Sequence, residues 1–377
     1  MKKYDVAAYI WPAYTGDEPR TRIFWPEGYG EWQTVKSAVS KSDKHIWPRK
    51  PLWGYCNEAD PYVMQMQIDA AADHGVNCFI YDWYWFDNRP FLEQCLDNGY
   101  LKAKNNDRVK FYIMWANHVA TSAWDKRTAH LDVPMWSCYA DMNRFRTICE
   151  RLTEMYFLHP SYYKIDGKPV FQFHDLCNYI VGIGGVDNAK RGIEMMNEIA
   201  IKAGLPGVYT QISLRGQSRE GFGLSGMFTK NPAALGFDGT VADAVDLVGI
   251  DSTTHYQMCG AVDIKRDYLS AFEDMKKTWE FSRQNYKAVY FPHVSLGWDP
   301  NPRYIDYRDD ILTDCTVGNI KTAFLAARDY IDAHPELPAP LVTVNSWNEW
   351  TECSYLEPDD LNGYGYLQAL KDVFLGE

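Results

Sequence analysis

The stretch Gly75-Val76-Asn77-Cys78-Phe79-Ile80-Tyr81-Asp82-Trp83-Tyr84-Trp85 decides the fold of this 377-residue chain. Gly75 ends a helix that begins at Pro61, and the apolar run Val76–Tyr81 predicts a buried strand. Polar and aromatic residues then close the run. Short apolar runs followed by helical periodicity recur along the chain, and this alternation favours parallel βαβ units.

Eight strands are expected from these runs, at residues 4–10, 76–81, 109–115, 168–173, 207–212, 245–252, 288–293 and 341–346, with 236–241 as a competitor for the sixth. Helices are expected at residues 61–75, 91–101, 140–156, 187–203, 264–285, 317–334 and 361–375. The alternation predicts an α/β fold, a (β/α)8 TIM barrel, formed by residues 1–377 as a single domain. Enlarged loops are expected at the C-terminal face of the barrel, after the first, third, fifth and seventh strands.

A doubly wound sheet is the alternative fold. Such a sheet normally carries a glycine-rich phosphate-binding loop after an early strand, and none follows one here. The one match to Gly-x-Gly-x-x-Gly, Gly221-Phe222-Gly223-Leu224-Ser225-Gly226, lies in mid-chain and does not directly follow a predicted strand. We interpret it as a flexible loop.

Composition argues against several classes of partner. A net charge of −12 repels nucleic acid and anionic membrane surfaces. No window approaches the ~20 apolar residues of a membrane helix. No Cys-x-x-Cys or His-x-x-x-His pair is present, so we expect neither a metal nor another cofactor. No feature of the sequence indicates a protein partner.

The nine cysteines are unpaired in spacing, and several lie inside apolar runs. They predict small buried hydrophobes in a reducing compartment. Cysteine usage therefore indicates the cytoplasm, whereas a trimmed export signal would indicate the periplasm, and the localisation is left open.

Aromatic residues make up 15% of the chain, with Trp and Tyr in excess. Rings with an apolar face and a polar tip suit stacking against sugars, and a Trp-rich core is the alternative interpretation. Many of these residues close predicted strands, where TIM-barrel enzymes gather their reacting groups. We expect a carbohydrate pocket there, built from Tyr9, Trp11, Asp82, Trp83, Tyr84, Trp115, Asn117, His174, His255, Tyr256, Trp298, Asp299 and Asn348.

Glu349 and Glu352 are the candidate catalytic residues. Two carboxylates three residues apart are often only a solvated helix face, but here they directly follow the eighth strand, beside Trp347 and Trp350. Glycoside cleavage needs two carboxyl groups about 5–9 Å apart in different environments, one protonated and one ionised. A strand end followed by one turn supplies that separation.

The block Asn348-Glu349-Trp350-Thr351-Glu352-Cys353-Ser354-Tyr355-Leu356-Glu357-Pro358, followed by Gly363-Tyr364-Gly365-Tyr366-Leu367, resembles the C-terminal signature of the glycoside hydrolase family 99-like, or WbsX-like, proteins. Weaker likenesses occur in that family's order at Gly30-Glu31-Trp32, Tyr81-Asp82-Trp83-Tyr84-Trp85, Trp115-Ala116-Asn117, Asp166-Gly167-Lys168-Pro169, and Gly297-Trp298-Asp299 with Arg303. The resemblance therefore spans nearly the whole chain.

This resemblance implies a TIM barrel and a retaining hydrolysis of α-linked glycans, with mannose as one candidate sugar. By position, Glu349 matches the residue that removes the proton from the sugar 2-hydroxyl, so that this oxygen attacks C1 and forms a 1,2-anhydro sugar. Glu352 matches the general acid/base. Thr351 and Cys353 depart from the true mannosidases, and His118 stands where WbsX-like chains commonly carry Glu.

Two other functions are weighed. WbsX-like proteins are often labelled glycosyltransferases, but no Asp-x-Asp motif or basic cluster for a sugar-nucleotide diphosphate is evident near the predicted pocket. A non-catalytic sugar-binding protein would keep the aromatics without needing both Glu349 and Glu352. The sugar, the linkage, and endo or exo action depend on loop shapes that the sequence does not specify.

Overall fold

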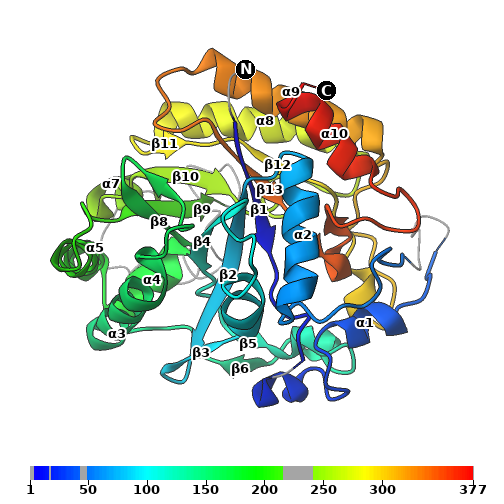
Figure 1. Cartoon of the computed structure of the whole chain (residues 1–377), viewed down its shortest axis with the longest axis horizontal. Helices are drawn as coiled ribbons and strands as arrows, with labels where there is room; N and C mark the ends of the chain where they lie inside the picture. Colours follow the sequence, from blue (N-terminus) through cyan, green and yellow to red (C-terminus); the bar gives the residue numbers. More distant parts are fainter. Residues whose placement is uncertain (1–3, 17, 43–48, 215–240, 377) are drawn as a thin grey trace.

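The computed structural model describes residues 4–16, 18–42, 49–214 and 241–376, and its centre is a ring of parallel strands (Figure 1). Seven strands follow one another around the ring from β10 to β13, and each strand pairs in parallel with the next. The strands are β10 (Ser252–His255), β9 (Tyr209–Leu214), β8 (Lys168–Phe173), β4 (Lys110–Trp115), β2 (Cys78–Phe86), β1 (Asp5–Ile10) and β13 (Leu341–Asn345). The expected TIM-barrel architecture is confirmed.

The seventh strand closes the ring in two pieces, β11 (Val289–Tyr290) and β12 (His293–Ser295). β11 pairs with β10, and β12 pairs with β13. Between them, the backbone N–H of Phe291 donates to Thr253 on one side at 2.9 Å, while the carbonyl of Pro292 accepts from Thr343 on the other at 3.1 Å. The strand is interrupted at Pro292, which has no N–H to give to a ladder.

Helices surround the barrel (Figure 1). They are α2 (Pro61–Asp73), α3 (Met142–Leu152), α4 (Leu176–Ile183), α5 (Val186–Lys202), α7 (Val241–Val248), α8 (Tyr268–Asn285), α9 (Val317–Ala333) and α10 (Gly365–Phe374), with the short α1 (Trp32–Ser37) in the loop after β1. None of the helices in the described part of the chain is long and apolar enough to span a membrane.

The expected sixth strand is wrong in position. Residues 245–248 end helix α7, and the strand begins only at Ser252. Val241, Ala244, Val245 and Val248 are the buried residues of this segment, and their spacing is that of one helix face. Of the competitor at 236–241, Val241 begins helix α7 and the other residues lie outside the described part of the chain, as does the glycine motif at 221–226.

The segment expected as a helix at 91–101 also differs. Its first residue belongs to the short strand β3 (Arg89–Phe91), which folds back on β2, and only Cys95–Tyr100 is helical, as a π-helical turn. β2 itself extends five residues beyond the expected end at Tyr81, to Phe86. The aromatic residues after Tyr81 therefore continue the strand.

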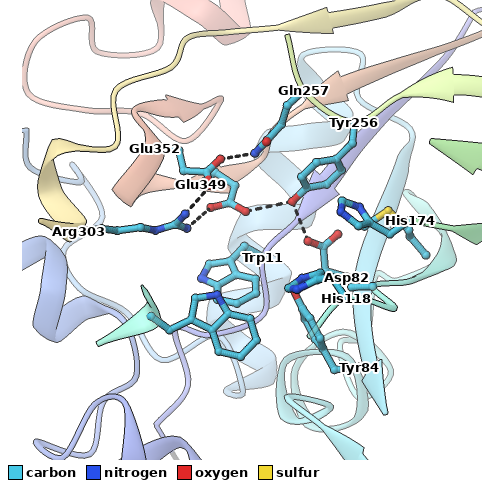
Figure 2. Close-up of a pocket in the computed structure, with 13 residues that line it drawn as sticks. Trp11, Asp82, Tyr84, His118, His174, Tyr256, Gln257, Arg303, Glu349 and Glu352 are labelled. Atoms are coloured by element: carbon cyan, nitrogen blue, oxygen red, sulfur yellow. Dashed lines mark hydrogen bonds and ion pairs between the residues drawn. The ribbon is translucent and has the colours of Figure 1, made fainter. Parts of the chain in front are cut away.

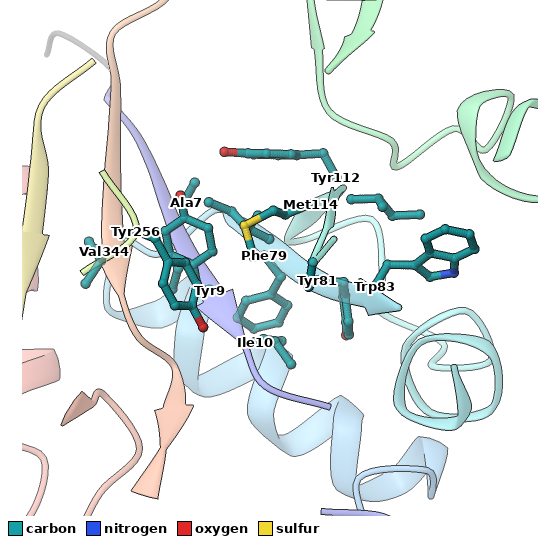
Figure 3. Close-up of a cluster of buried hydrophobic side chains, with 14 of the residues drawn as sticks. Ala7, Tyr9, Ile10, Phe79, Tyr81, Trp83, Tyr112, Met114, Tyr256 and Val344 are labelled. Carbon is teal, nitrogen blue, oxygen red and sulfur yellow. The ribbon is translucent and has the colours of Figure 1, made fainter. Parts of the chain in front are cut away.

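The barrel core is unusual in carrying many polar groups. The amide of Gln172 donates to both Tyr9 Oη and Ser213 Oγ at 2.8 Å, and Thr254 hydrogen-bonds Thr343 at 2.8 Å. Figure 3 shows Tyr9 beside Tyr256, whose rings pack edge to face with centroids 4.7 Å apart. These groups form a hydrogen-bonded floor under the C-terminal end of the strands.

Candidate active site

A pocket of about 250 Å³ opens at the C-terminal ends of the strands (Figure 2). Its walls come from the ends of β1, β2, β4, β8, β10 and β13 and from the loops that follow them. The lining residues are Trp11, Asp82, Tyr84, Met114, Ala116, His118, Trp124, His174, Tyr256, Gln257, Arg303, Glu349 and Glu352. Residues far apart in the sequence thus meet where the barrel predicts an active site.

A small hairpin after β13 positions the two glutamates. β14 (Asn348–Glu349) pairs with β15 (Ser354–Tyr355), and the residues between them include a 3-10 turn, Trp350–Glu352. The backbone N–H of Glu349 donates to Ser346 Oγ at 2.8 Å, and the Trp350 ring stacks on Tyr355 with centroids 3.9 Å apart. The structure places both glutamate side chains in the pocket, almost entirely buried.

Arg303 joins the two carboxylates. Its Nη1 contacts Glu352 Oε1 at 2.5 Å, and its Nη2 contacts Glu349 Oε2 at 3.2 Å. Its Nε donates to Thr351 Oγ1 at 2.8 Å and lies 3.5 Å from Glu31 Oε1. One guanidinium therefore holds the two glutamate carboxyl groups close together and also faces a third buried carboxyl group.

On the far side of Glu349, Tyr256 reaches a further carboxylate. The Tyr256 Oη lies 3.1 Å from Glu349 Oε1 and 2.8 Å from Asp82 Oδ2. The other Asp82 oxygen is buried and has no hydrogen-bond partner among the described residues. Gln257 donates to Glu352, so each glutamate has a polar partner besides Arg303.

Three aromatic rings form the apolar side of the pocket. Trp11, Tyr84 and Trp124 pack against one another with centroids 5.4–5.7 Å apart. The Trp11 indole N–H donates to Glu31 at 2.6 Å, which fixes the plane of its ring. Such rings suit the C–H faces of a sugar.

Burial sets the ionisation of these groups. It raises the pKa of Glu349 well above the ordinary value, and the neighbouring Glu352 raises it further while Arg303 opposes the shift. Burial raises the pKa of Asp82 and of Glu31 as well. Burial alone would lower the pKa of Arg303, but the carboxylates around it raise the pKa well above its usual value, so it stays charged. A raised pKa for Glu349 runs against the readily ionised Glu349 that the family resemblance implies.

Two of the tryptophans expected to bind sugar point away from the pocket, to the outer face of the sheet. Successive residues of a strand point to opposite faces, so Asp82 and Tyr84 face the pocket while Trp83 between them points outward. The Trp83 indole donates to Glu93 at 2.7 Å. Trp115 likewise leaves the pocket and stacks on Phe145 of helix α3, with centroids 5.8 Å apart.

Five other expected residues also do not line the pocket. Tyr9 lies beneath Tyr256 in the floor, and the ring of His255 hydrogen-bonds Tyr290 inside the barrel. Asn117 exchanges hydrogen bonds with the backbone of Asp175, which fastens two loops together. Trp298 and Asp299 line a separate cavity of about 510 Å³, which they share with Arg49, Leu312, Thr313, Asp314, Cys315, Thr316, Cys353, Leu361, Asn362 and Tyr366.

Asn348 supports the pocket from behind. Its side chain accepts from the backbone N–H of Trp11 at 2.8 Å and donates to the carbonyl of the same residue at 2.9 Å. It also donates to Glu58, which lies in a rear cluster with Gln67 and Glu357. Asn348 thus ties the end of β1 to the hairpin that carries Glu349.

Six lining residues were not among the expected site residues: Met114, Ala116, His118, Trp124, Gln257 and Arg303. His118 and Arg303 stand in the segments that carry the family resemblance, so a signal for them existed. Gln257 follows directly on Tyr256, after a strand that begins later in the chain than expected. Trp124 lies in a long loop, where residue type alone does not indicate position.

Comparison with families and proteins agrees with this architecture. The family model described as Glycosyltransferase WbsX matches residues 6–370. The uncharacterized protein WxcX of Xanthomonas campestris pv. campestris is 24% identical over 359 residues, which cover 94% of this chain and 47% of the relative. The chain therefore spans about half the length of the curated relatives it matches.

Two solved structures share the fold. The GH99 endo-alpha-mannosidase from Bacteroides thetaiotaomicron superposes with a TM-score of 0.58 at 13% identity, covering 98% of this chain and 96% of that one. A glycoside hydrolase-like protein superposes with a TM-score of 0.59 at 14% identity, covering 99% and 94%. At these identities the likeness establishes the fold alone.

Proposed function

The chain belongs to the WbsX glycosyltransferase family, and we propose that it is a glycoside hydrolase that cleaves α-linked glycans with Glu349 and Glu352 as its reacting pair. One observation carries the proposal. Two buried carboxylates at a barrel strand end share one guanidinium in a pocket walled by aromatic rings. Glycoside cleavage uses two such carboxyl groups on either side of the scissile bond.

The pocket suits a single sugar residue. About 250 Å³ is small beside the ~300–1,000 Å³ of typical ligand sites, so only one ring of a glycan would be enclosed. Trp11, Tyr84 and Trp124 would cover its C–H faces. His118 and His174 would bind hydroxyl groups. The rest of the glycan would extend over the loops around the opening.

The proposed cleavage has two steps. In the first, Glu349 takes the proton of the 2-hydroxyl, O2 attacks C1, the C1–O bond to the leaving sugar breaks, and Glu352 gives that oxygen a proton. In the second, water attacks C1 and passes a proton to Glu352, the C1–O2 bond breaks, and O2 regains its proton from Glu349. The product keeps its anomeric configuration because C1 is inverted twice.

Glycosyl transfer from a sugar nucleotide is the second candidate, favoured by the description of the family model. A diphosphate needs cations or free backbone N–H groups to neutralise its charge. Among the described residues that line the pocket, Arg303 is the one Lys or Arg, and its guanidinium already contacts Glu349 and Glu352. The pocket charge therefore supports hydrolysis over transfer from a nucleotide.

A substrate panel separates these functions. Aryl α-glycosides and α-linked oligosaccharides should release reducing sugar, and early NMR spectra should show the retained anomer first. Incubation with UDP- and GDP-sugars should release no nucleotide at a comparable rate. Nucleotide release that depends on an acceptor sugar, with no glycan cleavage, would overturn the proposal.

A further inference from the structure

Asp82, Tyr256 and Glu349 form a continuous chain of polar groups across the floor of the pocket (Figure 2). The three side chains come from β2, from the end of β10 and from the hairpin after β13. The phenol oxygen lies 2.8 Å from Asp82 Oδ2 and 3.1 Å from Glu349 Oε1, so both contacts are at hydrogen-bonding distance.

A count of protons shows what this geometry requires. A phenol carries one hydrogen, and an ionised carboxylate only accepts. Tyr256 can therefore donate to one of the two carboxyl groups but not to both. For both contacts to be hydrogen bonds, the other carboxyl group must itself carry a proton and donate it to Tyr256 Oη.

The surroundings of the two carboxyl groups differ, and the difference says which one carries the proton. Glu349 contacts Arg303 at 3.2 Å, whereas Asp82 has no ion pair among the described residues and is only 3% exposed. Its second oxygen, Oδ1, is buried with no partner in the described part of the chain. A buried, unpaired carboxylate is costly, and a neutral acid is not.

The other charged or titratable groups near Asp82 lie on several elements. Glu352 would repel a negative charge there, and Arg303 is already shared among the carboxyl groups of Glu31 and Glu352. His118 and His174 line the same pocket from the ends of β4 and β8. Burial raises the pKa of Asp82 well above its ordinary value, in agreement with the arrangement of charges.

We propose that Asp82 and Glu349 share one proton through Tyr256, and that Asp82 holds it in the free site, so that Glu349 is ionised and ready to act as a base. The Asp82 carboxylic acid donates to Tyr256 Oη, and the phenol donates to Glu349. No bond other than these hydrogen bonds changes. In this arrangement Asp82 is a positioning residue that keeps Glu349 charged in spite of its burial. The role of Glu349 as base rests on the proposed function, whereas the location of the proton does not.

Infrared spectroscopy tests the location of the proton without any substrate. Protonated carboxyl groups absorb apart from carboxylates, and difference spectra against the wild type cancel the signals of other buried acids. At neutral pH, Asp82→Asn should lose one carboxylic-acid band and Glu349→Gln should keep it. An unchanged band in Asp82→Asn, or loss of the band in Glu349→Gln alone, would overturn the proposal.

The pH profile of kcat/KM provides a second, functional readout. Asp82→Asn imitates the protonated acid and should keep activity within about 10-fold with the acidic limb unmoved, whereas Asp82→Leu should lose roughly 100-fold. Tyr256→Phe removes the donor that stabilises ionised Glu349, so the acidic limb should move to higher pH. A loss in Asp82→Asn as large as that in Asp82→Leu would contradict a neutral Asp82.

The two arms keep the proposals apart. If the infrared band behaves as expected and no glycan is cleaved, the shared proton stands and the proposed hydrolase function fails. If glycans are cleaved and the band persists in Asp82→Asn, the hydrolase stands and Asp82 is an ionised ligand of the sugar.

Discussion

Two buried acidic clusters adjoin the hairpin after β13, and different groups contact their carboxyl oxygens. The pocket cluster, here Glu349, Glu352 and Glu31, surrounds the guanidinium of Arg303. The rear cluster, Glu58 and Glu357, has no contact with Lys or Arg among the described residues. There the carboxyl groups accept hydrogen bonds from the side-chain N–H groups of Gln67, Asn348 and Trp350.

This difference suits the pocket cluster to proton transfer and the rear cluster to structural support. A nearby positive charge opposes the rise in pKa that burial causes in a carboxyl group, whereas neutral hydrogen-bond donors oppose it less and leave the protonated acid favoured. Burial raises the pKa of Glu58 to about 7 and that of Glu357 well above its ordinary value. The rear cluster is therefore suited to holding Asn348 and the hairpin in place, and the pocket cluster to moving protons.

The largest effect is expected from the reacting pair. Glu349→Gln should reduce kcat by roughly 10³-fold on every substrate, because no base remains to take the 2-hydroxyl proton. Glu352→Gln should lose as much on natural glycans but little on aryl glycosides with good leaving groups, since these depart without protonation. Both are measured as kcat on matched substrate pairs, with Glu154→Gln at an exposed site as the control. Normal turnover of a 2-deoxy substrate would contradict attack by O2.

The next effect is on stability and comes from removing the cation. Arg303→Met leaves three buried carboxylates without their partner, and the free energy of unfolding should fall by about 3–5 kcal/mol. Denaturant unfolding at pH 7 measures the change. Arg308→Met is the matched control, because its partner Asp310 is in an exposed pair and the expected change is within about 0.5 kcal/mol. Equal losses in the two variants would mean that the pocket cluster is not held by Arg303.

In the rear cluster a substitution is expected to raise the free energy of unfolding, by less than the Arg303 substitution lowers it. Because the folded-state pKa of Glu58 is raised from 4.5 to about 7, the folded protein binds this proton more tightly than the unfolded chain does. Stability from this group is thus complete below pH 4.5 and is lost as the pH rises through about 7. Glu58→Gln removes the titration, so relative to the wild type it should gain about 1–3 kcal/mol between pH 5 and pH 8. A pH-independent difference between the two proteins would show that Glu58 does not titrate in that window.

The architecture could be predicted from the sequence because buried parallel strands have the pattern of short apolar runs. Lys168–Phe173 has the bounds expected for it, and the gathering of Asp82, Tyr256 and Glu349 follows from barrel geometry once strand ends are known. Two features of the site could not be predicted from the sequence.

The first is which side chains of a strand face the pocket. Whether Trp83 or its neighbour faces the pocket depends on strand register and on where β2 ends, and a one-residue shift exchanges the two faces.

The second feature that could not be predicted is the set of contacts between loops distant in the sequence. Arg303 lies in a loop after the seventh strand and reaches the glutamates only through the three-dimensional path of that loop. The rear cluster likewise joins Glu58, from the loop before α2, to Glu357, and no local pattern links the two. Tertiary contacts of this sort have no periodicity for a sequence to display.

The smallest expected effect is on KM, and it tests whether the two clusters differ in ligand binding as well as in the pKa values of their acids. Trp11 gives its indole N–H to Glu31 at 2.6 Å in the pocket cluster, and Trp347 gives its own to Gln67 at 3.2 Å in the rear cluster. Phe at either position removes one hydrogen bond and should cost about 1 kcal/mol of stability. Only Trp11 also lines the pocket, so Trp11→Phe should raise KM several-fold while Trp347→Phe leaves KM unchanged. Unfolding curves and Michaelis plots on the same preparations separate the two contributions. A KM that rises equally in both variants would mean that the rear cluster shapes the sugar site directly, and the division between reacting and supporting acids would then fail.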